Sequence, residues 1–232
     1  LHGYLMSRLS GLWIGMKVVT TLADSTGTAE SDLARLNFVT PDLEFDGKVF
    51  TPNMNLGMNV RAEALEMEQS LYTRRLEVAK RYAAANKLNN VVFENPDAWL
   101  GIITAGKTYN DLRQCFLELG LDDAALRRYG IRILKMGMLF PMEPGVVRDF
   151  ARGLEEIFVI EEKRPFLEMF AKNVLYGQAN APRIVGKFDE EEKELLPHYG
   201  EFESDVIGRA LTKRLSRKAR VESAETWLAR LD

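Results

Sequence analysis

The chain has 232 residues, of which 46% are hydrophobic, enough to bury one large core or two modest ones. Its 31 basic and 34 acidic side chains nearly balance, whereas proteins that bind nucleic acid are usually strongly basic. The single cysteine excludes a disulfide or a thiolate cluster formed by this chain alone. No apolar run is long enough to cross a bilayer. We therefore expect a soluble, cytoplasmic protein with neither a nucleic-acid nor a membrane partner.

The first third of the sequence predicts a partial α/β segment followed by a long helix. Residues 4–9 have a helical pattern, and WIGMKVVT at residues 13–20 predicts a strand reached through a Ser-Gly turn. Residues 23–59 are rich in Asp, Thr, Pro and Gly, which predicts an irregular connection. Residues 60–87 carry an apolar stripe at helical spacing. Because the chain starts without Met inside a predicted helix, we interpret it as an internal fragment of a longer polypeptide.

From about residue 90 onward, short apolar strands alternate with helices of crossover length. The segments GIITA, IRILKM and IFVIE are apolar on both sides, as strands covered on both faces should be. This pattern predicts an α/β domain with a mainly parallel sheet and helices on both faces. Strands are expected at residues 91–93, 100–104, 131–136, 157–160 and 183–186, and helices at 108–119, 122–129, 145–154, 165–176 and 204–218.

Residues 101–108 match the GxxxxGKT pattern of phosphate-binding loops, which would make the chain a nucleotide-binding enzyme. In such a loop a strand ends at the first glycine, and the following backbone amides wrap a phosphate. Here Pro96 and Asp97 precede Gly101, and the apolar run at residues 100–104 falls inside the motif. We therefore predict a strand across the motif and keep nucleotide binding as an alternative hypothesis.

Lys107 and Thr108 are the candidate site residues of this region. They follow a predicted strand and begin a predicted helix, where open sheets bind ligands and anions are favoured. Both are candidate contacts for a bound anion. The simpler interpretation is that Thr108 is the helix N-cap, with Asp111 in the capping-box position. No residue is predicted to be catalytic or to bind a metal.

Three further features have structural interpretations. Residues 161–164 (EEKR) follow an apolar strand and predict a solvated turn with local ion pairs, or alternatively the lining of a cleft shared with another domain. The basic run at residues 213–220 closes an amphipathic helix and predicts a solvated helix end. Cys115 lies among apolar residues of a helix, which predicts a buried thiol.

Five segments in combination resemble the large indolepyruvate ferredoxin oxidoreductases of the 2-oxoacid:ferredoxin oxidoreductase superfamily. They are SRLSGLWIGMKVVTTLADST, GIITAGKTYNDLRQ, KMGMLFPMEP, FVIEEKRPFLE and PRIVGKFDE. The resemblance covers nearly the whole chain and is weakest around residues 43–59. With it we divide the chain into the end of a pyrimidine-binding-type domain (1–25), a connection with the long helix (26–89), a domain similar to the C-terminal domain of transketolase (90–218) and a C-terminal linker helix (219–232).

The resemblance implies a parent enzyme that uses thiamine diphosphate, Mg and iron–sulfur clusters. Such enzymes oxidatively decarboxylate a 2-oxoacid to an acyl-CoA, with coenzyme A as co-substrate and ferredoxin as electron acceptor. The sequence has neither a GDG-type metal motif nor a CxxC pair. No catalytic residue is therefore carried over, and we expect those sites upstream of Leu1 and downstream of Asp232.

The expected role is that of a non-catalytic structural and interaction segment, which orients the flanking domains and helps to form a homo-oligomer. As an isolated fragment, the chain is expected to be inactive and to hold no cofactor. A third hypothesis is a free-standing regulatory module of flavodoxin-like shape.

Overall fold

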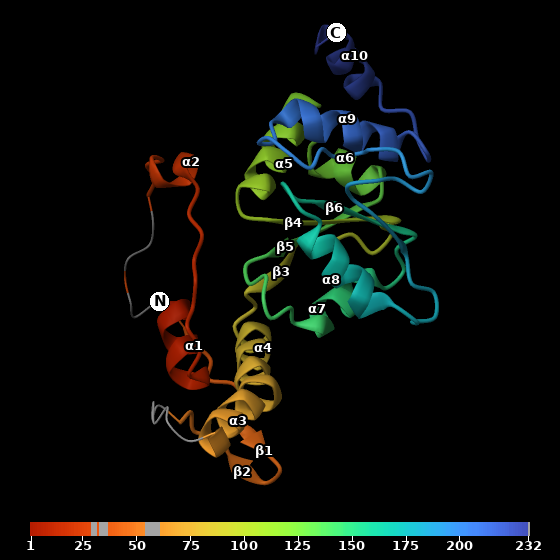
Figure 1. The fold of residues 1–232 in the computed structure, drawn as a ribbon. Coiled ribbons are helices and arrows are strands. Elements are labelled where there is room, and N and C mark those ends of the chain that lie inside the picture. The colour runs from red at the N-terminus through yellow and green to blue at the C-terminus, as the bar shows by residue number, and fades with distance from the viewer. Residues whose placement is uncertain (29–31, 33–36, 54–60, 232) are drawn as a thin grey trace. The chain divides into compact units, whose positions relative to one another are not determined.

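The chain divides into two compact units. Unit 1 comprises Leu1–Leu88 and Phe140–Glu143, and unit 2 comprises Asn89–Leu139 and Pro144–Asp232. The computed structural model (Figure 1) describes residues 1–28, 32, 37–53 and 61–231. Within these ranges, every helix is too short or too polar to cross a membrane.

Unit 1 is organised around one long helical stretch, as the apolar stripe at residues 60–87 predicts. The stretch consists of α3 (Arg61–Ser70), the π-helical turn η2 (Leu71–Arg75) and α4 (Leu76–Ala85). Val60 lies outside the described residues. The predicted first helix is also present, as α1 (His2–Ser10), and it packs against α4. The side chains of Met6 on α1 and Val78 on α4 are both buried.

The strand predicted at residues 13–20 is not formed, so this prediction is wrong. Residues 11–19 have no regular structure, and Thr20 begins the short helix α2 (Thr20–Ala23). The side chains of Trp13 and Met16 are 99% and 80% exposed. A strand needs a neighbour that pairs its backbone N–H and C=O groups, and no described segment pairs with this one. The β-forming side chains alone do not create a strand here.

The connection predicted at residues 23–59 contains a small hairpin that the sequence reading missed. Its strands are β1 (Glu44–Phe45) and β2 (Lys48–Val49), which pair antiparallel. The two residues between them, Asp46 and Gly47, have φ angles of 52° and 76°. Asp-Gly is the usual pair for a two-residue turn with positive φ at both positions, so the signal was present in the sequence. Residues 29–31, 33–36 and 54–60 of this connection lie outside the described residues.

Unit 2 is built on a five-stranded sheet in the order β3-β5-β4-β6-β7. The edge strand β3 pairs antiparallel with β5, and the other neighbours are parallel. This topology confirms the predicted α/β fold with a mainly parallel sheet. The strands are β3 (Asn89–Phe93), β4 (Leu100–Ala105), β5 (Ile131–Met136), β6 (Glu156–Ile160) and β7 (Arg183–Val185).

Helices cover both faces of the sheet, as predicted (Figure 1). One face carries α5 (Lys107–Glu118), α6 (Asp123–Arg128) and α9 (Ser204–Leu215), and the other carries α7 (Pro144–Ala151) and α8 (Phe166–Leu175). Alternation along β4 divides its residues between the faces: Ile102 belongs to the core under α5 and α9, whereas Gly101 lies against Phe150 of α7. Cys115 on α5 is completely buried, which confirms its predicted place in the core.

A helix is also present in the segment predicted as a C-terminal linker helix. It is α10 (Glu222–Leu231), and it packs on α9. Gly208 of α9 makes room for Trp227, because a Cβ atom at Gly208 would lie 2.6 Å from the indole ring. Val221 and Ala224 belong to the same buried cluster as the sheet. The segment is therefore part of the core of unit 2.

The tight packing at Gly101 gives a stability prediction. A Cβ atom there would lie 2.4 Å from Cδ1 of Leu154 and 2.8 Å from the ring of Phe150. We expect Gly101→Ala to destabilise unit 2 by about 1–3 kcal/mol through overpacking, measured by urea unfolding. Gly15→Ala is the control, because nothing lies within 4 Å of its added Cβ atom. Equal unfolding midpoints for wild type and Gly101→Ala would contradict this packing.

Candidate functional site

The order of the parallel strands creates a topological switch point between β4 and β6. The chain leaves β4 through α5 and α6 to form β5 on one side, and then crosses through α7 to form β6 on the other side. Open α/β sheets bind ligands outside the carboxyl ends of the strands at such a point. A ligand site of this fold is therefore expected at the carboxyl ends of β4 and β6.

Lys107 and Thr108 both lie at this edge, but not in the predicted capping arrangement. The N-cap of α5 is Gly106, with φ 54° and ψ −130°, a conformation that suits glycine. Because this turn is tight, the helix begins at Lys107, and the predicted N-cap role of Thr108 is wrong. The Thr108 hydroxyl instead donates to the carbonyl of Ala105 at 2.7 Å and lies 2.8 Å from the hydroxyl of Thr104. Thr108 thus ties the helix start to its own strand.

The GxxxxGKT match does not form a phosphate-binding loop. Leu100–Ala105 is a strand with a neighbour on each side, β5 and β6. The backbone groups that a phosphate loop turns toward its ligand are here paired within the sheet. This confirms the strand predicted across the motif, and it argues against the nucleotide-binding alternative.

The space outside the switch point is filled by residues Pro197–Phe202, which we call the strap. The Lys107 ammonium donates to the carbonyl of Phe202 at 2.8 Å, and the Phe202 N–H donates to Glu162 at 2.9 Å. Lys107 also pairs with Asp111 at 2.9 Å and lies 3.7 Å from Glu162. These carboxylates neutralise the Lys107 ammonium. Desolvation by burial lowers the pKa of Lys107, but the hydrogen bond to Asp111 and the nearby negative charges outweigh this effect, so the pKa is raised overall. Anion contact by Lys107 and Thr108 stays a prediction.

Residues 161–164 are only partly the solvated turn that the sequence predicts. Glu161 is buried, and its two carboxylate oxygens accept the N–H groups of Leu167 and Glu168 at 2.8 and 2.9 Å. It therefore caps α8, whose first N–H groups have no partner within the helix. Burial raises the pKa of Glu161, and these two hydrogen bonds oppose the rise. The solvated interpretation is wrong for Glu161, but Lys163 and Arg164 are exposed as expected.

Lys187, which the sequence reading did not single out, is the most enclosed charge at this edge. Its side chain is 1% exposed, and its ammonium donates to the carbonyls of Glu161 at 2.6 Å and Pro197 at 2.9 Å. The ammonium also lies 4.9 Å from the centre of the Phe202 ring. Desolvation lowers the pKa of Lys187, while nearby carboxylates oppose the change. Its place after an apolar strand end is the signal that could have identified it.

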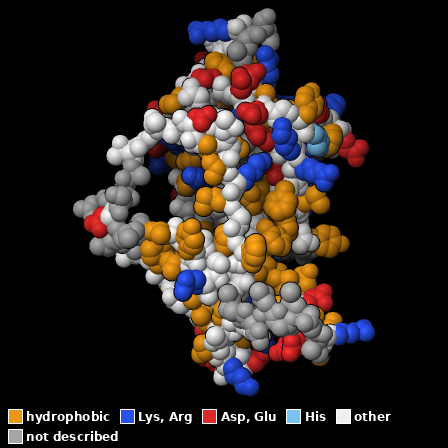
Figure 2. Space-filling view, turned by 60° about the vertical axis from the view of Figure 1, so that its left-hand side comes forward, with side chains coloured by type: hydrophobic (Ala, Val, Ile, Leu, Met, Phe, Trp, Pro, Cys, Tyr) orange, Lys and Arg blue, Asp and Glu red, His pale blue; other side chains and the backbone are white. Residues whose placement is uncertain are grey.

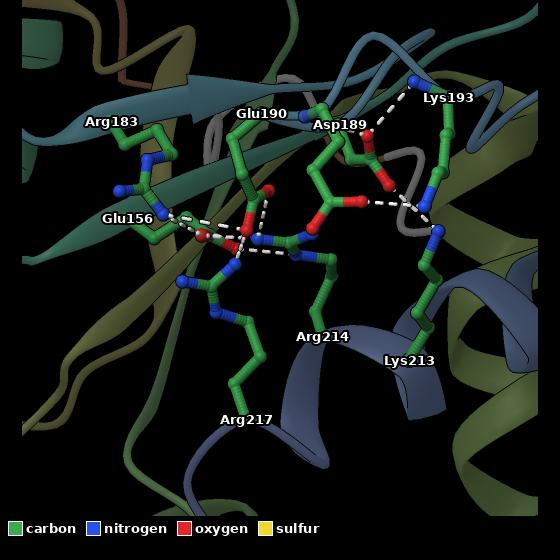
Figure 3. Close-up of polar contacts among 9 residues, drawn as sticks. Glu156, Arg183, Asp189, Glu190, Lys193, Lys213, Arg214 and Arg217 are labelled. Carbon is green, nitrogen blue, oxygen red and sulfur yellow. Dashed lines mark hydrogen bonds and ion pairs between the residues drawn. The ribbon is translucent and has the colours of Figure 1, made fainter.

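At the opposite edge of the sheet, a buried ion pair joins α9 to the start of β6 (Figure 3). Arg214 Nε and Nη2 donate to the two oxygens of Glu156 at 2.7 and 2.6 Å. The two side chains are 2% and 3% exposed. Glu190 lies between Arg214 and Arg217 and contacts both, so the loop after β7 joins the same network. The bidentate geometry is the strongest arrangement for such a pair.

The buried position of Arg214 corrects the solvated helix end predicted for residues 213–220. Arg214 follows Leu211 by three residues and Ile207 by seven, which places it on the apolar stripe of α9. The spacing could have predicted burial, but the partner could not be found, because Glu156 is 58 residues away in the sequence. Lys213 and Lys218 of the same run are exposed, as predicted.

The described residues do not fit the cofactors that the resemblance implies. An iron–sulfur cluster takes several thiolate ligands, and the chain has one cysteine. That thiol, Cys115, is buried, and desolvation raises its pKa to about 12. In the part of the chain that the structure describes, no group of three or more His, Cys, Asp or Glu side chains gathers as a metal site would require.

Comparison with protein families decides the affiliation of the chain. Residues 89–232, which correspond to unit 2, match the model of the indolepyruvate ferredoxin oxidoreductase middle domain. The chain belongs to the indolepyruvate ferredoxin oxidoreductase family. The resemblance seen in the sequence is thereby confirmed.

Curated relatives in this family are indolepyruvate oxidoreductase subunits IorA. The subunit from Methanothermobacter marburgensis is 26% identical over 211 residues, which cover 91% of this chain and 31% of the relative. The subunit from Thermococcus kodakarensis is 29% identical over 143 residues, 60% of this chain and 20% of the relative. The chain thus spans about a third of the length of the relatives that it matches most fully.

Two solved structures are also similar in part. A 2-oxoglutarate:ferredoxin oxidoreductase from Magnetococcus marinus aligns with a TM-score of 0.44 and 16% identity, over 81% of this chain and 28% of that chain. A split-gene transketolase, described as an inactive beta4 tetramer, aligns with a TM-score of 0.39 and 20% identity, over 56% of this chain and 42% of that chain.

The buried ion pair between Arg214 and Glu156 predicts that removal of Arg214 strongly destabilises unit 2. Arg214→Met leaves the Glu156 carboxylate buried without its main partner, which typically costs about 3–5 kcal/mol. We expect a loss of this size in the free energy of unfolding of unit 2, measured with denaturant. Lys218→Met is the matched control: its partner Glu155 is exposed, and exposed pairs contribute about 0–1 kcal/mol. Similar losses in both variants would show that the pair has no special role.

Asp189 gives a prediction for acid pH. A hydrogen bond from Lys213 at 2.7 Å is the main reason why the pKa of Asp189 is lowered to about 2. Because the folded pKa lies below the unfolded one, the group stabilises the fold above pH ~4, and this contribution is lost as the pH falls toward 2. In Lys213→Met we expect the Asp189 carboxyl resonance, followed by NMR, to titrate closer to its ordinary pKa. An unchanged titration would contradict the assigned cause, and Lys218→Met should leave it unchanged.

Proposed function

We propose that the chain is a non-catalytic structural and interaction segment of a thiamine diphosphate-dependent, indolepyruvate-type 2-oxoacid ferredoxin oxidoreductase. The observation that carries the proposal is the closed switch point: the strap and Lys107 occupy the edge of the sheet where a ligand of this fold would lie. The family membership supplies the reaction class of the parent enzyme. A chain that spans about a third of its relatives is consistent with one part of a larger catalyst.

In the proposed parent, a 2-oxoacid is oxidatively decarboxylated to an acyl-CoA, and electrons pass to ferredoxin. Thiamine diphosphate, Mg and the iron–sulfur clusters would be held elsewhere in the parent; in support, the chain has one cysteine, and its described residues contain no group of side chains that could hold a metal ion. Its own contribution is to hold neighbouring domains in place. In this proposal residues 1–25 end a pyrimidine-binding-type domain, residues 26–89 are a connection with the long helix, residues 90–218 form a domain similar to the C-terminal domain of transketolase, and residues 219–232 are a linker helix.

Exposed apolar side chains support the interaction part of the proposal. On α8, Phe166 and Met169 are 41% and 65% exposed, and Tyr176 just beyond the helix is 89% exposed. Aromatic and methionine side chains of this kind are typical of protein–protein contacts. Figure 2 shows further hydrophobic side chains exposed at the surface beside charged ones, and protein–protein interfaces combine such apolar area with a polar rim. We propose flanking domains of the same polypeptide, a second copy of the chain and, for the parent enzyme, ferredoxin as partners.

A second candidate is a free-standing regulatory module of flavodoxin-like shape. The four parallel strands favour it, because their order β5-β4-β6-β7 is the 2-1-3-4 order of flavodoxin-like sheets. The reading frame of the gene distinguishes the two candidates. A frame that continues beyond both ends of the chain into cofactor-binding sequence supports the first, and a start codon next to Leu1 with a stop after Asp232 supports the second.

Activity measurements test the proposed function directly. The purified chain with indolepyruvate, coenzyme A, thiamine diphosphate, Mg and a viologen dye is expected to give no substrate-dependent dye reduction, because in this proposal the cofactors bind to other parts of the parent enzyme. In the full-length parent, Lys107→Ala and Thr108→Val are expected to leave kcat and KM within about twofold of wild type, since the proposal gives neither residue a contact with the substrate. Turnover by the isolated chain, or a selective loss of kcat in Lys107→Ala, would overturn the proposal.

A further inference from the structure

The strap is anchored firmly at its two ends and weakly between them. Leu196, just before it, and Phe202, its last residue, are completely buried. Between these anchors Tyr199 is 74% exposed, and His198, Gly200 and Glu201 are exposed as well. The strap has no helical or strand structure. Segments with few buried apolar contacts open at low free energy while the rest of a protein stays folded.

Three lysines that lie outside the strap donate to backbone carbonyls at its start, in its middle and at its end. Lys187 donates to the carbonyl of Pro197, Lys163 to that of Gly200 and Lys107 to that of Phe202. These lysines follow the carboxyl ends of three parallel strands, β7, β6 and β4. The carboxyl edge of the sheet therefore holds the strap through three charge-assisted hydrogen bonds, which are stronger than neutral ones.

The backbone at Lys163 is also unusual. Its φ angle is 60°, in the left-handed region that residues other than glycine rarely adopt. Such conformations persist when the surrounding contacts impose them, and they cluster at switch regions and clamps. At Lys163 the contact that accompanies this conformation is the bond to the strap.

We propose that the strap is a displaceable closure of the switch point, which opens while the sheet beneath it stays folded and which the three lysine–carbonyl bonds keep shut. In the open form the ammonium of Lys107, the Glu162 carboxylate and the start of α5 face solvent. The closed strap thus covers the edge of the sheet at which open α/β folds bind ligands. The inference does not depend on the proposed role in a thiamine diphosphate enzyme.

Hydrogen exchange of single amides in the whole chain, followed by NMR, tests the proposal. The Phe202 N–H reports on the strap because it is bonded to Glu162, whereas Ile103 and Phe158 report on the centre of the sheet. In Lys187→Met we expect Phe202 to exchange about tenfold faster, because the charge-assisted bond to the Pro197 carbonyl of the strap is lost. Exchange at Ile103 and Phe158 should stay within about twofold, since local opening leaves the ladder intact.

Lys163→Met is the second variant, because Lys163 is exposed and its loss leaves the core unchanged. We expect it to speed Phe202 exchange by at least about threefold, so that the test stands even if Lys187→Met fails to fold. Lys193→Met is the matched control: its ammonium pairs with Glu191, and Phe202 exchange should not change. The proposal is overturned if Lys163→Met leaves Phe202 unchanged, or if the sheet amides speed up in the same proportion as Phe202.

Discussion

The desolvation of one ammonium group, that of Lys187, governs the carboxyl edge of the sheet. A buried cation is costly unless hydrogen-bond acceptors surround it. The acceptors available are the carbonyl of Glu161 at the end of β6 and that of Pro197 in the strap. In the closed form the strap thus supplies one of the two carbonyls that stabilise the Lys187 ammonium inside the protein. The backbone N–H of Lys187 adds to this constraint, since it donates to Glu168 of α8 at 3.0 Å.

At the opposite edge of the sheet lies the buried ion pair of Arg214 and Glu156. Together with Lys187 it explains why the segment after β7 is attached to both edges of the sheet. Arg214 on α9 binds Glu156 at the start of β6, and Glu190 in the loop after β7 completes that contact. Both ends of β6 are thus tied to the segment that leads from β7 into α9. Pairs of this kind add little stability compared with an apolar core, but removing one partner is costly. They specify where the segment lies relative to the sheet.

The periodic apolar pattern correctly predicted the strands and helices of unit 2. The predictions were wrong where the structure of a segment depends on which distant segment pairs with it. GIITA and IRILKM are buried on both faces, so their apolar runs were sufficient to identify strands. WIGMKVVT is also rich in apolar and β-branched residues but lacks a pairing strand among the described residues, and local propensity could not reveal that. Arg214 and Lys187 were missed as buried charges for a related reason. Their acceptors come from distant segments, and a single sequence does not show which segments meet.

Packing and local hydrogen bonds account for the residues at 101–108 that match GxxxxGKT, a pattern that marks a phosphate-binding loop in other proteins. Gly101 is required because Phe150 and Leu154 press against β4, and Gly106 is suited to the turn because its φ is positive. Lys107 binds the strap, and Thr108 bonds the end of β4 and approaches the carbonyl of Ile160 at 3.3 Å. Each fixed position of the motif therefore has its own structural cause, and none of these causes involves a phosphate. A motif indicates its usual chemistry only when the backbone around it has the usual course, and here a strand runs through it.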